Sequence, residues 1–186
     1  MRKAKFLNVV LLTAYSLGLT ALLAGCGYTS RSMISSKYRT IYITPFVNKI
    51  DITSEQYTQS KYRIYRPLLE TDVTRGVNDK YFFDGNLKPS TEAAADLVLK
   101  SELIEFRKDP LRYDSNDNVE EYRVNIVINM SLWDRKENKL VWEENGFTGE
   151  THYFTSGSNA KSEATAINDA ITDLARRIVE RTVEQW

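Results

Sequence analysis

EYRVNIVINMSLWD, residues 121–134, has the clearest hydrophobic pattern in this chain and decides its fold. Large apolar side chains occupy every second position from Tyr122 to Leu132, and mostly polar side chains lie between them. Val127 and Trp133 are the exceptions on the polar side. This alternation indicates a β-strand, because successive side chains of a strand point to opposite faces of a sheet. We therefore expect a long strand with one face buried against a core.

The sequence on either side of this segment predicts two partner strands. Residues 134–138 form a short polar turn, and residues 139–153 read as a further strand that is kinked near Asn145 and Gly146. Two strands joined by so short a turn pair antiparallel. Before the central segment, residues 96–106 predict another strand, with one face made by Leu97, Leu99, Ser101 and Leu103.

A first strand is predicted nearer the N-terminus, over residues 40–48. Its apolar residues favour a strand, but Pro45 cannot donate a hydrogen bond to a sheet ladder, so we expect an edge or a bulge there. The polar segment from Lys49 to Tyr62 shows no clear period. We expect a loop or an irregular helix in that segment.

Two segments have the three-to-four spacing of amphipathic helices. The first starts at Pro67, which suits the first turn of a helix, and is expected to end in a turn over residues 81–86. The second covers residues 162–186 and is the longer one. The predicted fold is α+β, in the order strand, helix, three strands, helix. Two amphipathic helices pack on one face of a four-stranded, largely antiparallel sheet.

The N-terminus reads as a targeting segment. It starts with the basic residues Arg2, Lys3 and Lys5 and continues with an apolar run over residues 6–23 that is long enough to cross a bilayer. The run ends in Leu23-Ala24-Gly25-Cys26, which resembles the lipobox of bacterial lipoproteins. In that family the peptide is cut before the cysteine, which is acylated. The alternative is an ordinary signal peptide or an anchor with a chance cysteine.

The lipobox resemblance divides the chain into three parts. It implies a removed signal peptide over residues 1–25 and a lipidated N-terminus at Cys26. The small polar residues that follow predict a short tether, so that residues 26–37 are the lipidated N-terminus and tether and residues 38–186 are one domain. Cys26 is the only cysteine, so its thiol is assigned to lipid and none is left for a disulfide. Several acyl chains on one cysteine give lasting membrane attachment. Gly27, in place of an aspartate, favours export to the outer membrane by the same resemblance.

The charge balance excludes one class of partner. The chain has 25 basic and 25 acidic residues, and removal of three basic ones, Arg2, Lys3 and Lys5, leaves 22 against 25, a net charge of −3. A mildly acidic domain is not an electrostatic binder of nucleic acid.

Few residues suggest catalysis. His152 is the only histidine, which excludes a metal site of two histidines, and we expect it at an ordinary sheet position. There is no Gly-rich phosphate loop and no Gly-x-Ser-x-Gly motif. Residues 114–118 imitate the start of a calcium loop, but Val119 stands where that loop needs glycine, so a polar hairpin loop is expected. The chain reads as a binding protein, not an enzyme, without metal or cofactor.

Two clusters of basic and aromatic residues could meet phosphates or membrane headgroups, and the alternative for each is a solvated face. The first cluster precedes the first helix and contains Lys61, Tyr62, Arg63, Tyr65 and Arg66. The second is expected in the loop before the central strand and contains Lys108, Arg112 and Tyr113.

Five short stretches follow one another along the mature chain. They are Gly25-Cys26-Gly27-Tyr28, Ile43-Thr44-Pro45-Phe46-Val47-Asn48, Ala95-Asp96-Leu97-Val98-Leu99, Glu121-Tyr122-Arg123-Val124, and the closing segment from Ser162 to Trp186. In this order and spacing they resemble the LptE family of lipopolysaccharide-assembly lipoproteins. The chain departs from that family in a longer polar segment, residues 49–62, and in its Asp-Asn loop.

The LptE resemblance implies a fold, a partner and a ligand. LptE-like proteins have two helices on a four-stranded sheet and sit as a plug within the outer-membrane β-barrel LptD, lipid-anchored on the periplasmic side or in the lumen. They help the barrel to assemble and to receive lipopolysaccharide. The resemblance assigns lipopolysaccharide contact to basic residues whose nearest matches here are Arg112 and Lys161. We expect both at one end of the sheet. The planar guanidinium of arginine can bind a lipid A phosphate through two hydrogen bonds, and the lysine ammonium offers it a compact positive charge.

Two other functions stay open at this point. LpoB-like lipoproteins, which regulate a peptidoglycan synthase, also join a lipobox to a small α+β domain, but residues 27–37 are a short tether for crossing the periplasm. A lipid-anchored hydrolase would need His152 or a carboxylate pair in a cleft. A generic lipid-anchored periplasmic binding module is the least specific alternative.

Overall fold

The structure is a computed structural model that describes residues 38–52 and 66–183. The predicted signal peptide, Cys26 and its tether, and the basic cluster at residues 61–65 lie outside the described residues, as does most of the polar segment 49–62. No helix within the described ranges is long and apolar enough to cross a membrane.

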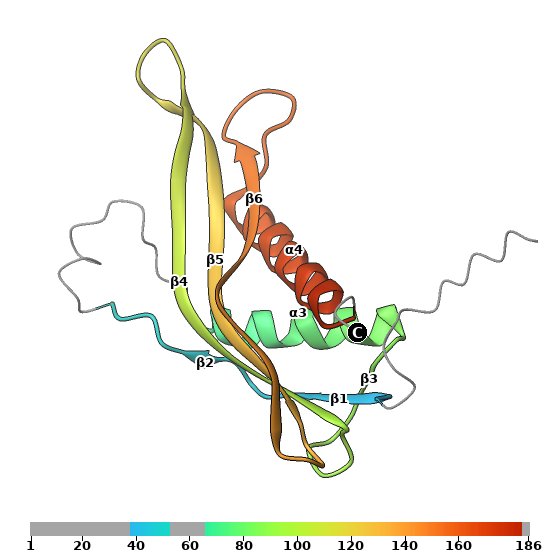
Figure 1. Cartoon of the computed structure of the whole chain (residues 1–186). Helices are drawn as coiled ribbons and strands as arrows, with labels where there is room; N and C mark the ends of the chain where they lie inside the picture. Colours follow the sequence, from blue (N-terminus) through green and yellow to red (C-terminus); the bar gives the residue numbers. More distant parts are fainter. Residues whose placement is uncertain (1–37, 53–65, 184–186) are drawn as a thin grey trace, which may run out of the picture. The chain divides into compact units, whose positions relative to one another are not determined.

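Eight elements follow one another along the described chain (Figure 1). They are β1 (Thr40–Ile43), β2 (Val47–Asn48), α3 (Leu69–Asp84), β3 (Lys88–Pro89), β4 (Leu97–Tyr113), β5 (Val119–Asp134), β6 (Lys139–Phe154) and α4 (Glu163–Val183). The predicted α+β fold with two helices and a sheet is therefore confirmed.

The six strands of the described residues form one mixed sheet in the order β3-β1-β4-β5-β6, with β2 also beside β4. β5 is antiparallel to both β4 and β6, whereas β1 is parallel to β3 and β4, and β2 is parallel to β4. The prediction of four largely antiparallel strands is wrong in this detail. The chain returns to the sheet through α3, and a crossover of that kind joins parallel strands.

The predicted first strand is divided in two by Pro45. β1 ends at Ile43 and β2 starts at Val47. Between them, the Thr44 N–H donates to the Leu99 carbonyl over 3.0 Å, and the Phe46 N–H donates to Oγ1 of Thr74 in α3 over 3.0 Å. The backbone donors on either side of the proline are thus satisfied outside a regular ladder.

β4 is longer than predicted. It continues past residue 106 to Tyr113, so Lys108, Arg112 and Tyr113 lie in a strand and the prediction of a loop there is wrong. Pro110 is tolerated because the described strands on the far side of β4 pair only with residues 97–103, which leaves this part of β4 at an edge. The loop at residues 114–118 connects β4 to β5 as expected, and Oδ1 of Asp114 accepts the N–H of Asn116 over 2.8 Å.

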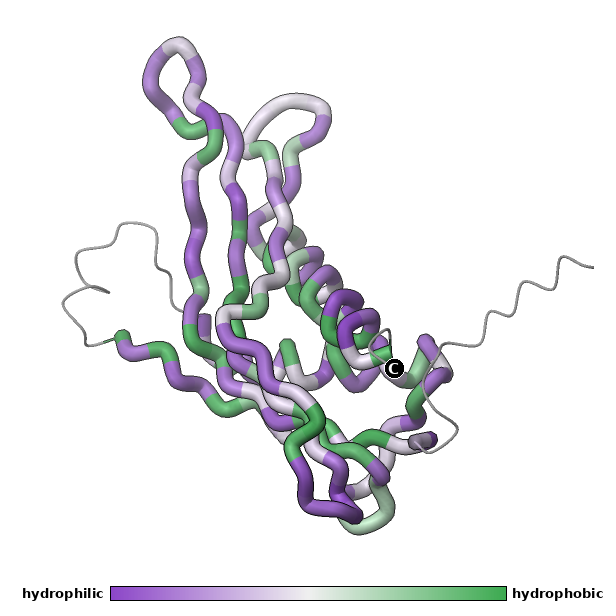
Figure 2. The backbone as a smooth tube through the Cα atoms, in the orientation of Figure 1, coloured by the Kyte–Doolittle hydropathy of each residue, from purple (hydrophilic) through white to green (hydrophobic). Residues whose placement is uncertain are grey.

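The core lies between the sheet and the two helices, which cover the same face (Figure 1). Every second residue of β5 from Val124 to Leu132 is at most 2% exposed, as the period-two pattern predicts. Figure 2 shows apolar and polar residues alternating along the long strands and hydrophilic residues at the two hairpin turns. Ser162 caps α4, because its Oγ accepts the Thr165 N–H over 3.1 Å.

The end of α3 also differs from expectation. The sequence predicts that a turn over residues 81–86 ends the helix, but residues 81–84 are still helical and Gly85 closes the helix with a φ of 76°. Tyr81 is fully buried, and this burial holds the last turn against α4.

Candidate functional site

Arg112 and Lys161, the two cations predicted from the family resemblance, both contact Phe154, the last residue of β6. The guanidinium carbon of Arg112 lies 5.6 Å from the centre of the Phe154 ring. The backbone N–H of Lys161 donates to the Phe154 carbonyl over 3.1 Å. The fold thus brings the end of β4, the end of β6 and the segment before α4 together (Figure 1). We call this region the basic end.

Strand register places Arg112 on the sheet face that the helices leave open. Arg112 stands opposite Glu121 on β5, and Glu121 stands opposite Phe154 on β6. The Arg112 Nη2 atom lies 3.7 Å from Oε2 of Glu121, and 59% of the arginine side chain remains exposed. The guanidinium is therefore partnered by one carboxylate and one ring but still open to solvent.

Lys161 has a similar arrangement at the start of α4. Its Nζ lies 2.8 Å from Oδ2 of Asp169, and half of its side chain is exposed. Exposed ion pairs of this kind contribute little free energy in water. Another anion could therefore replace Asp169 as the partner of Lys161 at small cost. Glu121, by contrast, is a buried carboxylate and depends on Arg112 as its cationic partner.

A second group at the basic end fixes α4 to the sheet. The Lys108 Nζ lies 2.5 Å from Oε2 of Glu163 and 4.8 Å from the centre of the Tyr122 ring. The Tyr122 ring stacks on Tyr153 at 5.9 Å and 26°, and the Tyr153 hydroxyl donates to the same Glu163 oxygen over 3.4 Å. This group holds the segment that carries Lys161 in place.

The environment of Tyr153 keeps its hydroxyl neutral. Burial, followed by the charge of Glu163 and the hydrogen bond to it, raises the pKa of Tyr153 to about 12. The phenol therefore remains a hydrogen-bond donor at physiological pH. The sequence patterns indicated Lys108 but not Tyr153, Phe154 or Glu163 as members of this region.

The residues considered for catalysis are not brought together. His152 is exposed on β6 opposite Arg123. Oε2 of Glu144 pairs with Arg181 of α4 at 2.6 Å, whereas Glu143 faces the other side of the sheet. Within the described residues, no group of three histidine, cysteine, aspartate or glutamate side chains could hold a metal ion. That the chain is not an enzyme stays a prediction.

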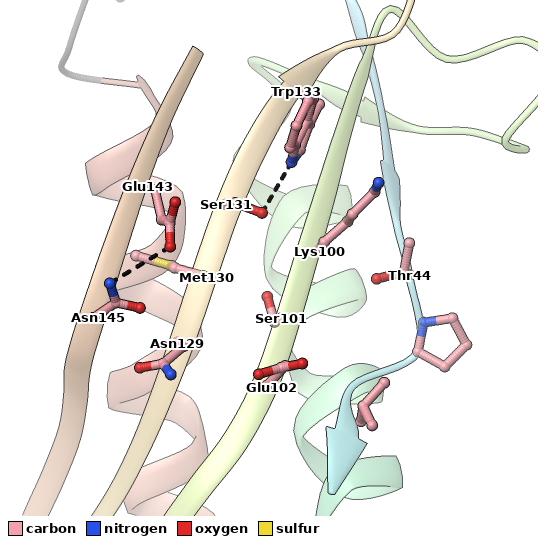
Figure 3. A pocket seen from close by; sticks show the side chains of 12 residues that line it. Thr44, Lys100, Ser101, Glu102, Asn129, Met130, Ser131, Trp133, Glu143 and Asn145 are labelled. Carbon is pink, nitrogen blue, oxygen red and sulfur yellow. Dashed lines mark hydrogen bonds between the residues drawn. The ribbon is translucent and has the colours of Figure 1, made fainter. Parts of the chain in front are cut away.

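A shallow pocket of about 500 Å³ lies on the open face of the sheet (Figure 3). Lys100 Nζ lies 4.9 Å from the centre of the Trp133 ring, and the Trp133 indole N–H donates to Oγ of Ser131 over 3.0 Å. The side chains of Glu102 and Asn129 also line it. No sequence motif indicated this pocket, because its residues come from separate strands. The lining is mixed, because these polar side chains lie beside the apolar surfaces of Val47 and Trp133.

Three lipoproteins of solved structure are similar to this chain. A minor lipoprotein from Acinetobacter baumannii has 13% identity and a TM-score of 0.45, covering 78% of this chain and 93% of its own. Rare lipoprotein B from Shewanella oneidensis has 15% identity and a TM-score of 0.42, covering 76% and 92%. An uncharacterized lipoprotein B from Nitrosomonas europaea has 14% identity and a TM-score of 0.47, covering 78% and 83%. No curated protein matches the chain.

The LptE family model, described as lipopolysaccharide-assembly, matches residues 38–182. This range contains all six described strands, both helices, and the basic end with Arg112 and Lys161. Of these elements, only Val183, the last residue of α4, lies beyond it. The match covers well over half of the 186 residues. The chain therefore belongs to the LptE family of lipopolysaccharide-assembly proteins.

Proposed function

We propose that the chain is an outer-membrane lipoprotein that assists lipopolysaccharide assembly as the plug and scaffold of an LptD-type β-barrel. Acylated Cys26 holds it at the membrane, and its activity is binding rather than catalysis. The family match over residues 38–182 is the observation that carries this proposal.

The open face of the sheet supports a position inside a barrel. Its exposed or half-buried side chains include Lys100, Glu102, Asn129, Ser131 and Glu143. The lumen of a large outer-membrane barrel is polar and filled with water, so a polar sheet face suits it. A lipid anchor also raises the effective concentration of the domain near a barrel in the same membrane.

The basic end is the proposed lipopolysaccharide contact. The Arg112 guanidinium lies over the Phe154 ring, and the Lys161 backbone N–H donates to the Phe154 carbonyl. At least half of each cationic side chain is exposed. Arg112 offers a planar fork for a phosphate and Lys161 a compact charge. Both residues lie at one end of the sheet, and we infer that they meet the same anionic headgroup.

The plug role is tested by affinity purification of the acylated protein from outer membranes, followed by identification of the proteins that copurify. We expect a large β-barrel in stoichiometric amount. Recovery without any such barrel contradicts the plug role, and recovery of a peptidoglycan synthase in its place would support the LpoB-like alternative.

The ligand contact is tested separately with Arg112→Glu combined with Lys161→Glu, on immobilised lipopolysaccharide. Loss of two charge-assisted contacts should weaken binding at least about tenfold. The matched control reverses Arg75 of α3 and Lys139 of β6, two exposed cations outside the basic end. If both double variants bind like the unchanged protein, the assignment of Arg112 and Lys161 is wrong.

A further inference from the structure

Two neighbouring phenylalanines at the end of α3 are exposed. Phe82 is 73% and Phe83 is 81% exposed, and their rings meet edge to face at 5.8 Å and 84°. The preceding residue, Tyr81, is fully buried and donates to Oγ1 of Thr182 over 2.7 Å. The phenylalanine pair therefore projects from a helical turn that is fixed to the core. Large apolar side chains that are exposed next to each other mark an interaction surface.

This pair lies at the end of the domain where the chain from the N-terminus enters. After α3, the chain forms β3, where Lys88 pairs with Thr40 of β1 and the Lys88 N–H donates to the Arg39 carbonyl over 3.0 Å. Tyr38 is the first described residue and directly precedes Arg39. Figure 1 shows the start of β1, β3 and the end of α3 on one side of the domain.

We propose that Phe82 and Phe83 insert into the phospholipid surface to which the anchor is attached. The inference rests on the proposed function, because it requires an acylated Cys26. The eleven residues between Cys26 and Tyr38 can extend at most about 40 Å, so the start of the domain stays within that distance of the bilayer. Aromatic rings on a rigid helix end suit the boundary between headgroups and acyl chains.

The insertion sets the orientation of the domain, whereas the acyl chains alone set its attachment. β4 starts at Leu97, which pairs with Ile41 of β1, and ends at Tyr113 in the basic end. Its 17 residues span roughly 50 Å at the usual rise of a strand. With Phe82 and Phe83 in the bilayer surface, Arg112 is held away from the leaflet that carries the anchor.

The test uses the full acylated chain in vesicles of phosphatidylethanolamine and phosphatidylglycerol, with the photoreactive residue benzoylphenylalanine at position 83. The matched control carries the same residue in place of Leu111, which is 43% exposed beside Arg112. After illumination we expect phospholipid adducts at position 83, with position 111 at the level seen without vesicles. Absence of lipid adducts at position 83, or equal adducts at both positions, overturns the proposal.

Two readouts separate this proposal from the one it rests on. Mass spectrometry of Cys26 and flotation with the vesicles report the anchor itself, and a chain that is neither acylated nor floated overturns both proposals. A chain that is acylated and floats but forms no lipid adduct at position 83 overturns the insertion alone. In native outer membranes, a crosslink from position 83 to a protein in place of lipid would assign Phe82 and Phe83 to a protein partner and overturn the insertion.

Discussion

Gly149 of β6 packs directly against Leu174 of α4, so closely that a Cβ added at position 149 would stand 2.6 Å from the Leu174 Cα. The obstructing atoms belong to the backbone and to the Cβ of Leu174, which cannot rotate away. Gly149→Ala must therefore move α4 off the sheet or displace β6. Such overpacking costs about 1–3 kcal/mol of the free energy of unfolding, which denaturant titration followed by circular dichroism would measure.

Gly76→Ala in α3 is the matched control. A Cβ there would lie 2.7 Å from Cγ2 of Ile171, a single side-chain methyl, and not from the backbone of α4. Alanine also stabilises a helix interior by roughly 1 kcal/mol over glycine, which offsets the cost of the contact. We expect a much smaller loss than for Gly149→Ala. An equal loss at both positions would show that backbone contact is not what makes position 149 sensitive.

A hydrogen bond between the hydroxyls of Tyr81 and Thr182 connects the C-terminal ends of α3 and α4 inside the core. Tyr81 donates to Thr182 over 2.7 Å, and Thr182 donates to the Ile178 carbonyl over 2.8 Å. Tyr81→Phe removes one bond and should cost about 1 kcal/mol. Thr182→Val removes the acceptor of the buried Tyr81 hydroxyl and should cost up to about 3 kcal/mol. Combining both changes should cost less than the sum of the two, and additive losses in denaturant titrations would contradict a direct coupling.

Local periodicity predicted the central elements well. β5 and α4 were identified because each has a long run with one period, and the two helices cover one sheet face as expected. The parallel pairing of β1 was missed because a strand of four residues carries no signal for its partner. The full length of β4 was missed because Pro110 and its charged neighbours resemble a loop unless the unpaired edge is known.

The pairing of residues at the basic end could not be predicted from the sequence. The turn between β5 and β6 pairs Asp134 with Lys139, and an unbroken ladder from there would pair Tyr122 with Thr151. Two register shifts instead pair Tyr122 with Tyr153. Bulges of this kind are set by packing over the whole sheet. Resemblance located Arg112 and Lys161, but the aromatic residue between them depends on this register.

Asp96 makes the start of β1 sensitive to acid. One carboxylate oxygen accepts the N–H groups of Arg39 and Thr40 over 3.0 and 3.2 Å, and the other lies 2.8 Å from the Lys136 Nζ. The hydrogen bond from Lys136, followed by the one from the Arg39 backbone, holds the pKa of Asp96 well below its usual range. The stabilisation is therefore present above the unfolded pKa of about 3.9 and is lost as pH falls below it.

Asp96→Asn should lower the free energy of unfolding by about 1 kcal/mol at pH 7, because Lys136 is mostly exposed and its pairing is screened. Below pH 4 the difference in the free energy of unfolding between Asp96→Asn and the unchanged protein should shrink. At that pH the Asp96 carboxylate of the unfolded chain becomes protonated, so folding no longer gains the full benefit of its charge. Denaturant titrations at pH 7 and pH 3 measure both values. Asp79→Asn, on the exposed side of α3, is the control. A difference that is the same at both pH values would rule out the charge of Asp96 as its cause.

Glu163 tunes the hydroxyl of Tyr153 at the basic end. The folded pKa of Tyr153, about 12, lies above the ordinary value of 10.0, so its stabilising effect is present below pH 10 and is lost as pH rises toward 12. Glu163→Gln removes the charge that disfavours the tyrosinate, and the pKa should fall. Burial is the larger cause, so the pKa should remain above 10.0.

Absorbance at 295 nm during alkaline titration measures this shift, and Tyr153→Phe identifies which part of the signal belongs to Tyr153. The control is Asp169→Asn, which removes a carboxylate at the same end of the domain that pairs with Lys161 and not with Tyr153. It should leave the Tyr153 titration unchanged. If Glu163→Gln also leaves it unchanged, burial alone raises the pKa, and Glu163 serves only to pair with Lys108. A downward shift with Glu163→Gln alone would establish that the start of α4 and the end of β6 are coupled through this carboxylate.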